Sequence, residues 1–155
     1  MSQVKPTILV TGGAGYIGSH AVLTLLRAGY EAIVLDNLEY GHRELVEDVL
    51  QAELVVGDIS DRALLDKLFA TYQIAAVVHL AAYIAVGESV SDPAKYYRNN
   101  VAGTLTLLEA MVAADVKKIV FASTCSIFGL PQQVPMTEEH PFNNRTFYGA
   151  TKTAG

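Results

Sequence analysis

The chain is poor in cysteine, tryptophan and proline: it has one cysteine, no tryptophan and five prolines in 155 residues. The single cysteine, Cys125, cannot form a disulfide within the chain, which is typical of proteins from a reducing compartment. No apolar run approaches the ~20 residues that a membrane-spanning helix needs. The start, MSQVKPTILVTGG, lacks the long apolar segment and cleavage site of a signal peptide. We therefore expect a soluble, cytoplasmic protein with no membrane partner.

Positive charge is also scarce, because 11 Lys and Arg stand against 16 Asp and Glu and give a net charge of -5. Without a basic stripe to neutralise phosphates, nucleic acid is not an expected partner. A small anionic ligand remains possible, since backbone N–H groups can bind it without Lys or Arg. Apolar residues make up 51% of the chain, which excludes a disordered protein, and the length predicts one domain. We expect no metal site.

Short apolar runs alternate along the chain with stretches of helical periodicity. The runs are almost wholly apolar, as expected for parallel strands that are covered on both faces. Their alternation with helices predicts right-handed βαβ units and an α/β fold, a doubly wound, Rossmann-like parallel sheet with helices on both faces, truncated after about five strands. The expected strands are 7–11, 32–35, 53–56, 75–80 and 118–122, and the expected helices are 16–28, 61–72 and 93–114.

Four apolar residues of the last expected helix recur at helical spacing. They are Leu105, Leu108, Met111 and Val112. Such a stripe is typical of the side of a helix that faces a core. We therefore expect all four side chains to pack inside the domain.

The first expected strand runs into TGGAGYIGSH, where Gly12, Gly15 and Gly18 open a helix in a G-x-x-G-x-x-G series. Glycines in this place permit a tight turn, the close approach of a pyrophosphate to backbone N–H groups, and helix-to-strand packing. Alone the series is weak, because such glycines are often only structural. Asp36 follows the second strand at about the ~20-residue offset where a carboxylate binds the adenosine ribose, although Asp36-Asn37 is also a common turn pair. A carboxylate there would repel a 2′-phosphate and favours NAD.

Polar residues also follow the later strands, whose carboxyl ends share one edge of the sheet. Asp58 could hydrogen-bond the adenine amino group or cap the following helix, a role for which Asp61 competes. We expect His79 to be a buried, hydrogen-bonded histidine and not a catalyst. Cys125 has no nearby base and is expected to be a small packing residue.

Tyr148 and Lys152 stand four residues apart in FYGATKTAG, so on a helix they share one face. An ammonium beside a phenol stabilises the phenolate and allows it to act as a base. Thr124, at the end of the fifth expected strand, could hydrogen-bond the same substrate hydroxyl and relay its proton. The alternative is that Tyr148 and Lys152 are an ordinary surface pair. Their combination with the glycine series and Thr124 argues against this alternative.

Seven segments carry a resemblance that covers nearly the whole chain: TGGAGYIGSH, the DN after the second expected strand, GDI, HLAAYIAVGESV, YYRNNVAGTLTLLEAM, STCSIFG and YGATK. Together they resemble the extended short-chain dehydrogenase/reductase superfamily and, within it, the UDP-glucose (UDP-galactose) 4-epimerases. The resemblance implies an NAD-dependent isomerase of galactose and nucleotide-sugar metabolism. It implies the catalytic residues Thr124, Tyr148 and Lys152, and cofactor contacts from Gly12, Gly15, Tyr16, Ile17, Gly18, Asp36, Asn37, Asp58, Ile59, Leu80, Ala81, Ala82, Asn99, Tyr148 and Lys152.

The resemblance also implies the roles of the catalytic residues. Tyr148 would remove the proton from the sugar 4-hydroxyl while C4 gives a hydride to NAD, leaving a 4-keto sugar that turns over before the hydride returns. Lys152 would hold the nicotinamide ribose. The related 4,6-dehydratases need a carboxylate pair just after the threonine, where this chain has Cys125 and Ser126, and this favours epimerisation. Phe128 stands where the family usually has tyrosine, and residues 143–147 replace a proline-containing lead into Tyr148.

Family members continue well beyond the position of Gly155. The resemblance therefore implies that residues 1–155 are an NAD-binding domain cut early in the catalytic helix, without the C-terminal substrate lobe and inactive alone. The complete enzyme is expected to bind a UDP-sugar and to form a homodimer. The alternatives are a non-catalytic dinucleotide-binding or oligomerising module, or another nucleotide-sugar enzyme such as a UDP-pentose or UDP-uronate 4-epimerase or a 4,6-dehydratase.

Overall fold

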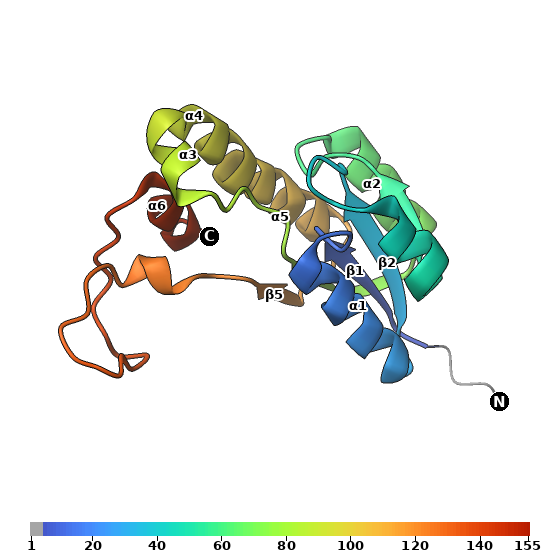
Figure 1. Ribbon diagram of the computed structural model, residues 1–155. Coiled ribbons are helices and arrows are strands. Elements are labelled where there is room, and N and C mark those ends of the chain that lie inside the picture. The colour runs from blue at the N-terminus through green and yellow to red at the C-terminus, as the bar shows by residue number, and fades with distance from the viewer. Residues whose placement is uncertain (1–4) are drawn as a thin grey trace. The chain divides into compact units, whose positions relative to one another are not determined.

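The computed structural model describes residues 5–155 and divides into two compact units (Figure 1). The first unit comprises the chain up to Ala81 together with Leu105–Ala122, and the second comprises Ala82–Thr104 and Ser123–Gly155. Within the described residues, no helix combines the length and the apolar character needed to cross a membrane.

The first unit is built on a five-stranded sheet in the order β3-β2-β1-β4-β5, with every neighbouring pair parallel. From β1 the successive strands are added first on one side (β2, β3) and then on the other (β4, β5). Doubly wound sheets bind their ligands at the point where this change of side occurs. The predicted fold class is confirmed, and each predicted strand lies within one residue of an observed one. The strands are β1 (Thr7–Thr11), β2 (Glu31–Asp36), β3 (Glu53–Val56), β4 (Ile74–His79) and β5 (Ile119–Phe121).

Helices cover both faces of this sheet (Figure 1). On one face α1 (Tyr16–Arg27) and the π-helical stretch η1 (Leu45–Leu50) pack on alternate residues of β1 and β2. On the other face α2 (Arg62–Thr71) and α5 (Thr104–Ala113) pack on the remaining ones. Side chains alternate between the two faces of a strand, and helices cover both faces of this sheet, so the residues on both sides of each strand are apolar. This explains the unbroken apolar runs of the sequence.

The face that α5 turns to the core differs from the prediction. Met111 is buried as expected, but it packs with Leu107 and Ala110. Leu105 and Val112 are 57% and 80% exposed, and the third expected residue, Leu108, is also exposed. The prediction failed because α5 is apolar around most of its circumference, so helical spacing alone could not select the buried side.

The second unit consists of short helical elements. The helix predicted over 93–114 is present as three consecutive segments, of which α5 belongs to the first unit. Three elements were not predicted, η1 among them, because each is too short to show a clear periodicity. The elements of this unit are α3 (Val86–Ser91), α4 (Pro93–Tyr96), the π-helical stretch η2 (Tyr97–Gly103), the 3-10 turn η3 (Cys125–Ile127) and α6 (Phe147–Thr153).

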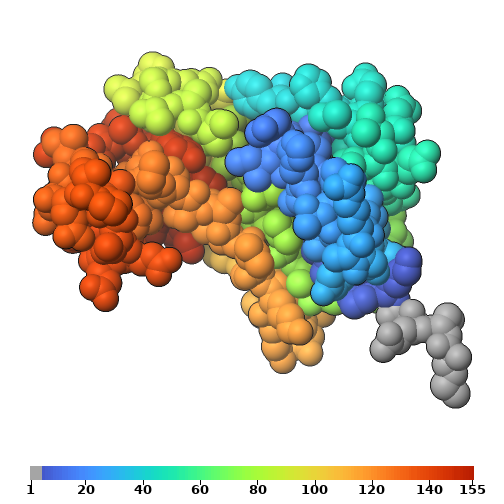
Figure 2. Space-filling view, turned by 60° about the horizontal axis from the view of Figure 1, so that its bottom comes forward, coloured from blue at the N-terminus to red at the C-terminus, as the bar shows by residue number. Residues whose placement is uncertain are grey.

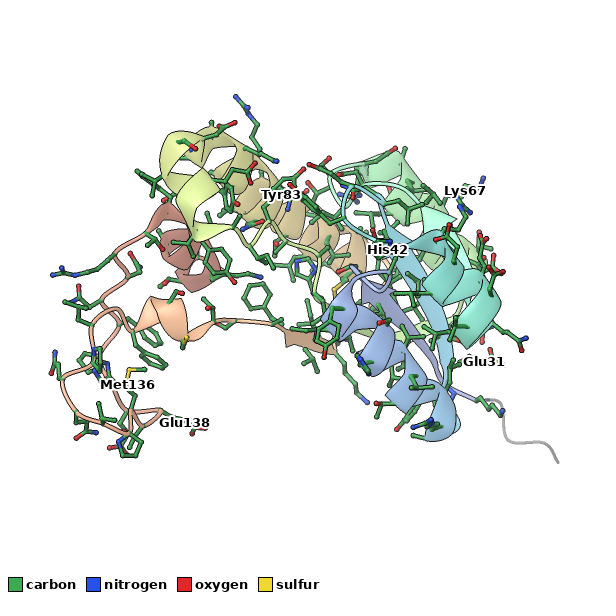
Figure 3. All side chains as sticks on the ribbon, in the orientation of Figure 1. Glu31, His42, Lys67, Tyr83, Met136 and Glu138 are labelled. Carbon is green, nitrogen blue, oxygen red and sulfur yellow. The ribbon has the colours of Figure 1, made fainter. Side chains whose placement is uncertain are left out.

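Residues 129–144 form a largely exposed loop of the second unit, seen as orange-red atoms in Figure 2, with Met136 and Glu138 labelled in Figure 3. The ring of Phe128 lies 5.6 Å from the rings of both His140 and Phe142. His140 Nε2 accepts a hydrogen bond from the Gln132 N–H at 3.0 Å. The Phe128 ring therefore packs against this loop, which is also held by a hydrogen bond from the Asn143 N–H to the Ile127 carbonyl at 2.9 Å.

Candidate nucleotide-binding and catalytic site

The predicted glycine turn connects β1 to α1. Gly12 has a φ of +72°, and a Cβ there would lie 2.7 Å from the Ala81 backbone nitrogen. A Cβ on Gly18 would overlap the carbonyl oxygen of Gly12. Gly13, which the sequence analysis did not single out, is equally constrained, since its Cβ would lie 2.8 Å from a Val34 methyl. These three glycines are required by the packing of the chain itself.

Gly15 differs from the other glycines of the turn. It is the N-cap of α1 with a φ of -82°, and its Cβ would meet only the Gly12 oxygen, at an ordinary 3.5 Å. It offers no capping side chain, and the first turn of α1 contains no acidic residue. The backbone N–H groups of that turn and the helix dipole therefore suit an anion. Tyr16 and Ile17, which begin the helix, are 81% and 68% exposed. The site fits a dinucleotide pyrophosphate.

Asp36 lies against the glycine turn and is 8% exposed. Its Oδ2 accepts a hydrogen bond from the Ala14 N–H at 3.0 Å, and its Oδ1 accepts one from the Leu38 N–H at 2.9 Å. The second bond confirms that Asp36 forms a turn, and the first shows that it also fixes the glycine loop. Its role toward a ribose stays a prediction.

A segment that the sequence analysis missed covers the same turn. The His42 N–H donates to the Ala14 carbonyl at 3.0 Å (His42 is labelled in Figure 3). A Cβ on Gly41 would lie 2.6 Å from Asp36 Oδ1. No sequence motif marks these residues, because their contact depends on how the chain folds back after β2.

The two polar residues that follow β2 and β3 are joined. Asn37 donates its Nδ2–H to Asp58 Oδ2 at 3.1 Å. Although burial alone would raise the pKa of Asp58, hydrogen bonds from the Ser60 hydroxyl and N–H and from Asn37 bring that pKa below its usual value. Asp61, not Asp58, caps α2 by accepting from the Leu64 N–H at 3.0 Å. Asp58 thus holds Asn37 at the sheet edge as a carboxylate. Ile59 beside it is buried.

The end of β4 completes this edge. Leu80 and Ala81 are half-buried and lie directly against Gly12. His79 is 1% exposed, and its Nδ1 is hydrogen-bonded to Thr11 Oγ1 at 2.6 Å. The ring of His79 also lies 5.7 Å from the ring of Phe121. The prediction of a satisfied, buried histidine is confirmed.

The second unit contains the catalytic candidates on α6. Thr146 caps this helix by accepting from the Gly149 N–H at 3.0 Å. Tyr148 and Lys152 are 9% and 6% exposed, so they are not an ordinary surface pair. Burial lowers the pKa of Lys152 from 10.5 to about 8. With this pKa, the ammonium form of Lys152 predominates at pH 7, and it loses its proton as the pH rises through about 8.

Thr124 is the N-cap of η3, which packs against α6. Thr124 Oγ1 accepts a hydrogen bond from the Ser126 N–H at 3.2 Å and donates one to Ser126 Oγ at 3.3 Å. A Cβ on Gly149 would lie 2.9 Å from the Ser126 carbonyl oxygen, so the two elements approach closely. Cys125 is exposed, and the prediction that it packs inside the domain was wrong. The Cys125 side chain points out of the turn that Thr124 caps.

Asn99 and Asn100 connect the loop after Ala82 with α6. Asn99 Nδ2 donates to Asn100 Oδ1 at 2.9 Å. Asn100, which the sequence analysis did not select, is 2% exposed and binds both backbone groups of Tyr83, at 2.9 and 3.0 Å. It also donates to Thr151 Oγ1 at 3.1 Å. The Asn-Asn pair in YYRNNVAGT was its only sequence signal, and nothing in that pair tells which residue points inward.

The parallel sheet, the glycine turn after β1 and the carboxylate after β2 define a Rossmann-like, dinucleotide-binding protein. Within the described residues, no group of three or more His, Cys, Asp or Glu side chains could hold a metal ion. The profile of the NAD dependent epimerase/dehydratase family matches residues 8–155. The chain belongs to this family, which confirms the superfamily suggested by the sequence motifs.

Curated proteins similar to this chain agree with the narrower resemblance. The chain is 54% identical over 147 residues to UDP-glucose 4-epimerase of Halalkalibacterium halodurans, covering 95% of this chain and 43% of the relative. It is 53% identical over 149 residues to the UDP-glucose 4-epimerase of Rhizobium leguminosarum bv. trifolii, covering 94% and 44%. The chain thus spans less than half the length of the curated relatives it matches.

Solved structures show the same likeness. The UDP-glucose 4-epimerase of Brucella ovis in complex with NAD has a TM-score of 0.91 at 44% identity, over 96% of this chain and 45% of that one. The enzyme of Bifidobacterium longum in complex with NAD+ and UDP has a TM-score of 0.90 at 40% identity, over 95% and 46%. The fold of this chain is that of the matching part of these epimerases.

Proposed function

We propose that this chain is the NAD-binding part of a nucleotide-sugar 4-epimerase that interconverts UDP-glucose and UDP-galactose. The observation that carries the proposal is the identity of 53–54% with UDP-glucose 4-epimerases over 94–95% of the chain. The buried pair Tyr148 and Lys152 and the glycine turn support it. Cys125 and Ser126, in place of a carboxylate pair after Thr124, favour epimerisation over dehydration.

In this proposal the first unit binds the adenosine and pyrophosphate of NAD. The N–H groups of Tyr16 and Ile17 bind the pyrophosphate, because no side chain caps the N-terminus of α1. Gly15, whose own N–H donates to the Gly12 carbonyl at 3.3 Å, lets the pyrophosphate approach the backbone. Asp36 and Asn37 bind the ribose. The other proposed cofactor contacts are Gly12, Gly18, Asp58, Ile59, Leu80, Ala81, Ala82, Asn99, Tyr148 and Lys152.

The second unit supplies the proposed catalytic groups. Tyr148 takes the proton of the sugar 4-hydroxyl and later returns it, and Thr124 hydrogen-bonds the same hydroxyl. The Lys152 ammonium stabilises the phenolate and binds the nicotinamide ribose. Bound NAD supplies the acceptor for the hydride from C4. Because burial lowers the pKa of Lys152 to about 8, its catalytic contribution falls as the pH rises through that value.

The remaining features of the complete enzyme are also proposals. A further lobe, corresponding to the unmatched length of the relatives, binds the UDP-sugar. The enzyme works in the cytoplasm, where NAD is available and a free thiol such as Cys125 stays reduced. A homodimer is proposed because Leu105, Leu108 and Val112 form an exposed apolar stripe on α5.

Cofactor binding is tested by thermal unfolding with and without NAD, comparing the native chain with Gly15→Ala. Because an alanine Cβ at this position meets no closer atom than 3.5 Å, the variant should lose only the roughly 0.5–1 kcal/mol by which alanine is a poorer N-cap than glycine when NAD is absent. It should nevertheless lose most of the NAD-dependent rise, because the methyl occupies the place of the pyrophosphate. An equal rise in both proteins would contradict the proposed site.

Epimerase activity is tested with the complete protein and UDP-galactose, following the formation of UDP-glucose. Activity that is lost in Tyr148→Phe supports the proposal. Stabilisation by NAD without any turnover would favour the second candidate, a non-catalytic dinucleotide-binding module. For residues 1–155 alone we expect no appreciable turnover, since the binding energy of the nucleotide would be missing.

A further inference from the structure

The helix that carries Tyr148 is too short to fix the tyrosine by itself. α6 has seven residues, less than two full turns, and helices of this length are unstable in water without external contacts. The first N–H groups of any helix lack partners within it. In α6, Thr146 satisfies the Gly149 N–H. The N–H of Tyr148 needs an acceptor from elsewhere.

That acceptor is Ser89, a fully buried residue of α3. Its Oγ accepts a hydrogen bond from the Tyr148 N–H at 3.2 Å and donates its own proton to the Val86 carbonyl at 2.6 Å. Because the hydroxyl proton is used within α3, a lone pair of the oxygen stays directed at Tyr148. The carbonyl of Tyr148 is bound as well, by Thr151 Oγ1 at 2.8 Å. Both peptide groups of the tyrosine are therefore held by buried side chains.

α3 is itself anchored. The Glu88 carboxylate accepts hydrogen bonds from Lys95 at 2.9 Å and from the Tyr96 hydroxyl at 2.8 Å, which join α3 to α4. The Tyr96 hydroxyl has a single proton, which it shares between this carboxylate and the Ala85 carbonyl at 2.7 Å, and the Tyr96 side chain is fully buried. Ser89 thus presents its oxygen from a fixed helix and not from a mobile loop.

We propose that Ser89 is a positioning residue for the catalytic tyrosine: its hydroxyl fixes the Tyr148 backbone and so aims the phenol at the substrate. The inference rests on the proposed function for its catalytic consequence. A displacement of about 1 Å at a reacting group can cost about 100-fold in rate. The phenol lies at the far end of a long side chain, so a small rotation of α6 moves it by more than the backbone.

The test compares Ser89→Ala with Ser91→Ala in the complete protein. Ser91 is the matched control, because it lies on the same helix and donates in the same way to the Glu88 carbonyl at 3.1 Å, but is exposed. In Ser89→Ala we expect kcat for UDP-galactose to fall about tenfold or more, with KM and NAD retention within about twofold. Ser91→Ala should match the native enzyme. Ser89→Thr, which keeps the oxygen, should recover most of kcat.

A local readout tests the hydrogen bond independently of activity. The protein is labelled with ¹⁵N-tyrosine, and the signal of Tyr148 is identified by its loss in Tyr148→Phe. Ser89→Ala should speed hydrogen exchange of this amide about fivefold to tenfold, and Ser91→Ala should not. If Ser89→Thr does not fold, Ser89→Cys, of similar size and with a weaker acceptor, should lie between native and Ser89→Ala.

Three outcomes overturn the inference or its basis. An unchanged Tyr148 amide in Ser89→Ala refutes the hydrogen bond. A freed amide with unchanged kcat refutes the positioning role. Absence of epimerase activity in the native complete protein refutes the proposed function and the catalytic part of the inference, while the amide measurement still decides whether Ser89 holds Tyr148.

Discussion

At the scale of single residues, Lys152 is the most unusual group of the chain. It is 6% exposed, and burial lowers its pKa to about 8. A buried ammonium destabilises the folded state, because the charge loses its hydration. Such a cost is typical of a group retained for function, since catalytic sites gather groups with perturbed pKa values.

Replacement of Lys152 by methionine should therefore stabilise the fold at neutral pH. Between about pH 8 and 10.5 the unfolded chain binds more protons at this residue than the folded chain, so the native free energy of unfolding should rise with pH there. Lys152→Met should be more stable than native by ~2 kcal/mol at pH 7, and the advantage should shrink above pH 8. Urea denaturation at pH 7 and 9.5 measures both. Parallel pH dependence in the two proteins would refute this explanation.

The glycines allow a second test at this scale. Gly18→Ala should cost about 1–3 kcal/mol in the free energy of unfolding, because its Cβ would overlap the Gly12 oxygen. Gly87 in α3 is the control, since a Cβ there meets nothing within 4 Å. Gly87→Ala should be neutral or stabilise by roughly 0.5–1 kcal/mol. Chemical denaturation of the three proteins checks both values, and an equally stable Gly18→Ala would contradict the observed turn.

The sequence predicted part of the site at residue level. The need for glycine at positions 12 and 18 and the buried, hydrogen-bonded state of His79 were predicted correctly, because local chemistry determines what a tight turn or a buried imidazole requires. Ser89 and Asn100 were missed. Their importance comes from contacts with Tyr148 and Thr151, more than 50 positions along the chain, and no local pattern reports such a partner.

At the scale of elements, helix ends follow their local chemistry closely. Asp61 and Thr146 cap α2 and α6 by accepting from the N–H three residues on. The choice between Asp58 and Asp61 was open in the sequence. The structure decides it, because the carboxylate of Asp58 is already bound to Ser60 and Asn37.

The cap of α2 gives a prediction at this scale. Asp61→Ala should lower the free energy of unfolding by about 1 kcal/mol, because the Leu64 N–H loses its acceptor. Asp61→Asn keeps a capping oxygen and should stay within a few tenths of a kcal/mol of native. Thermal or urea denaturation measures both. Neither change should alter the NAD-dependent rise in unfolding temperature, and equal losses in the two variants would exclude capping as the cause.

At the scale of the whole molecule, the exposed apolar stripe on α5 is the surface that we expect a second subunit to cover. Leu105 and Val112 are 57% and 80% exposed. The proposed homodimer predicts that a carboxylate placed in this stripe prevents association, since burying an unpaired charge costs several kcal/mol. We expect the dimer Kd of Leu105→Glu and Val112→Glu to rise about 100-fold or more.

Sedimentation measures the association, with Val49→Glu as the control. Val49 is 70% exposed on η1, so the same substitution there adds the same charge away from the stripe. It should leave the dimer intact. A native protein that is monomeric at micromolar concentration, or a control that dissociates like Leu105→Glu, would contradict the proposed interface.

The sequence by itself determined the order of strands and helices, the glycine turn and the tyrosine–lysine spacing. Hydrophobic periodicity, secondary-structure propensity and turn chemistry each depend on only a few neighbouring residues. Only the tertiary structure decided which face of α5 is buried, that Gly15 is the one glycine of the turn without a close neighbour, and that Ser89 contacts Tyr148. These depend on which distant segments pack together, and packing is a property of the folded chain as a whole.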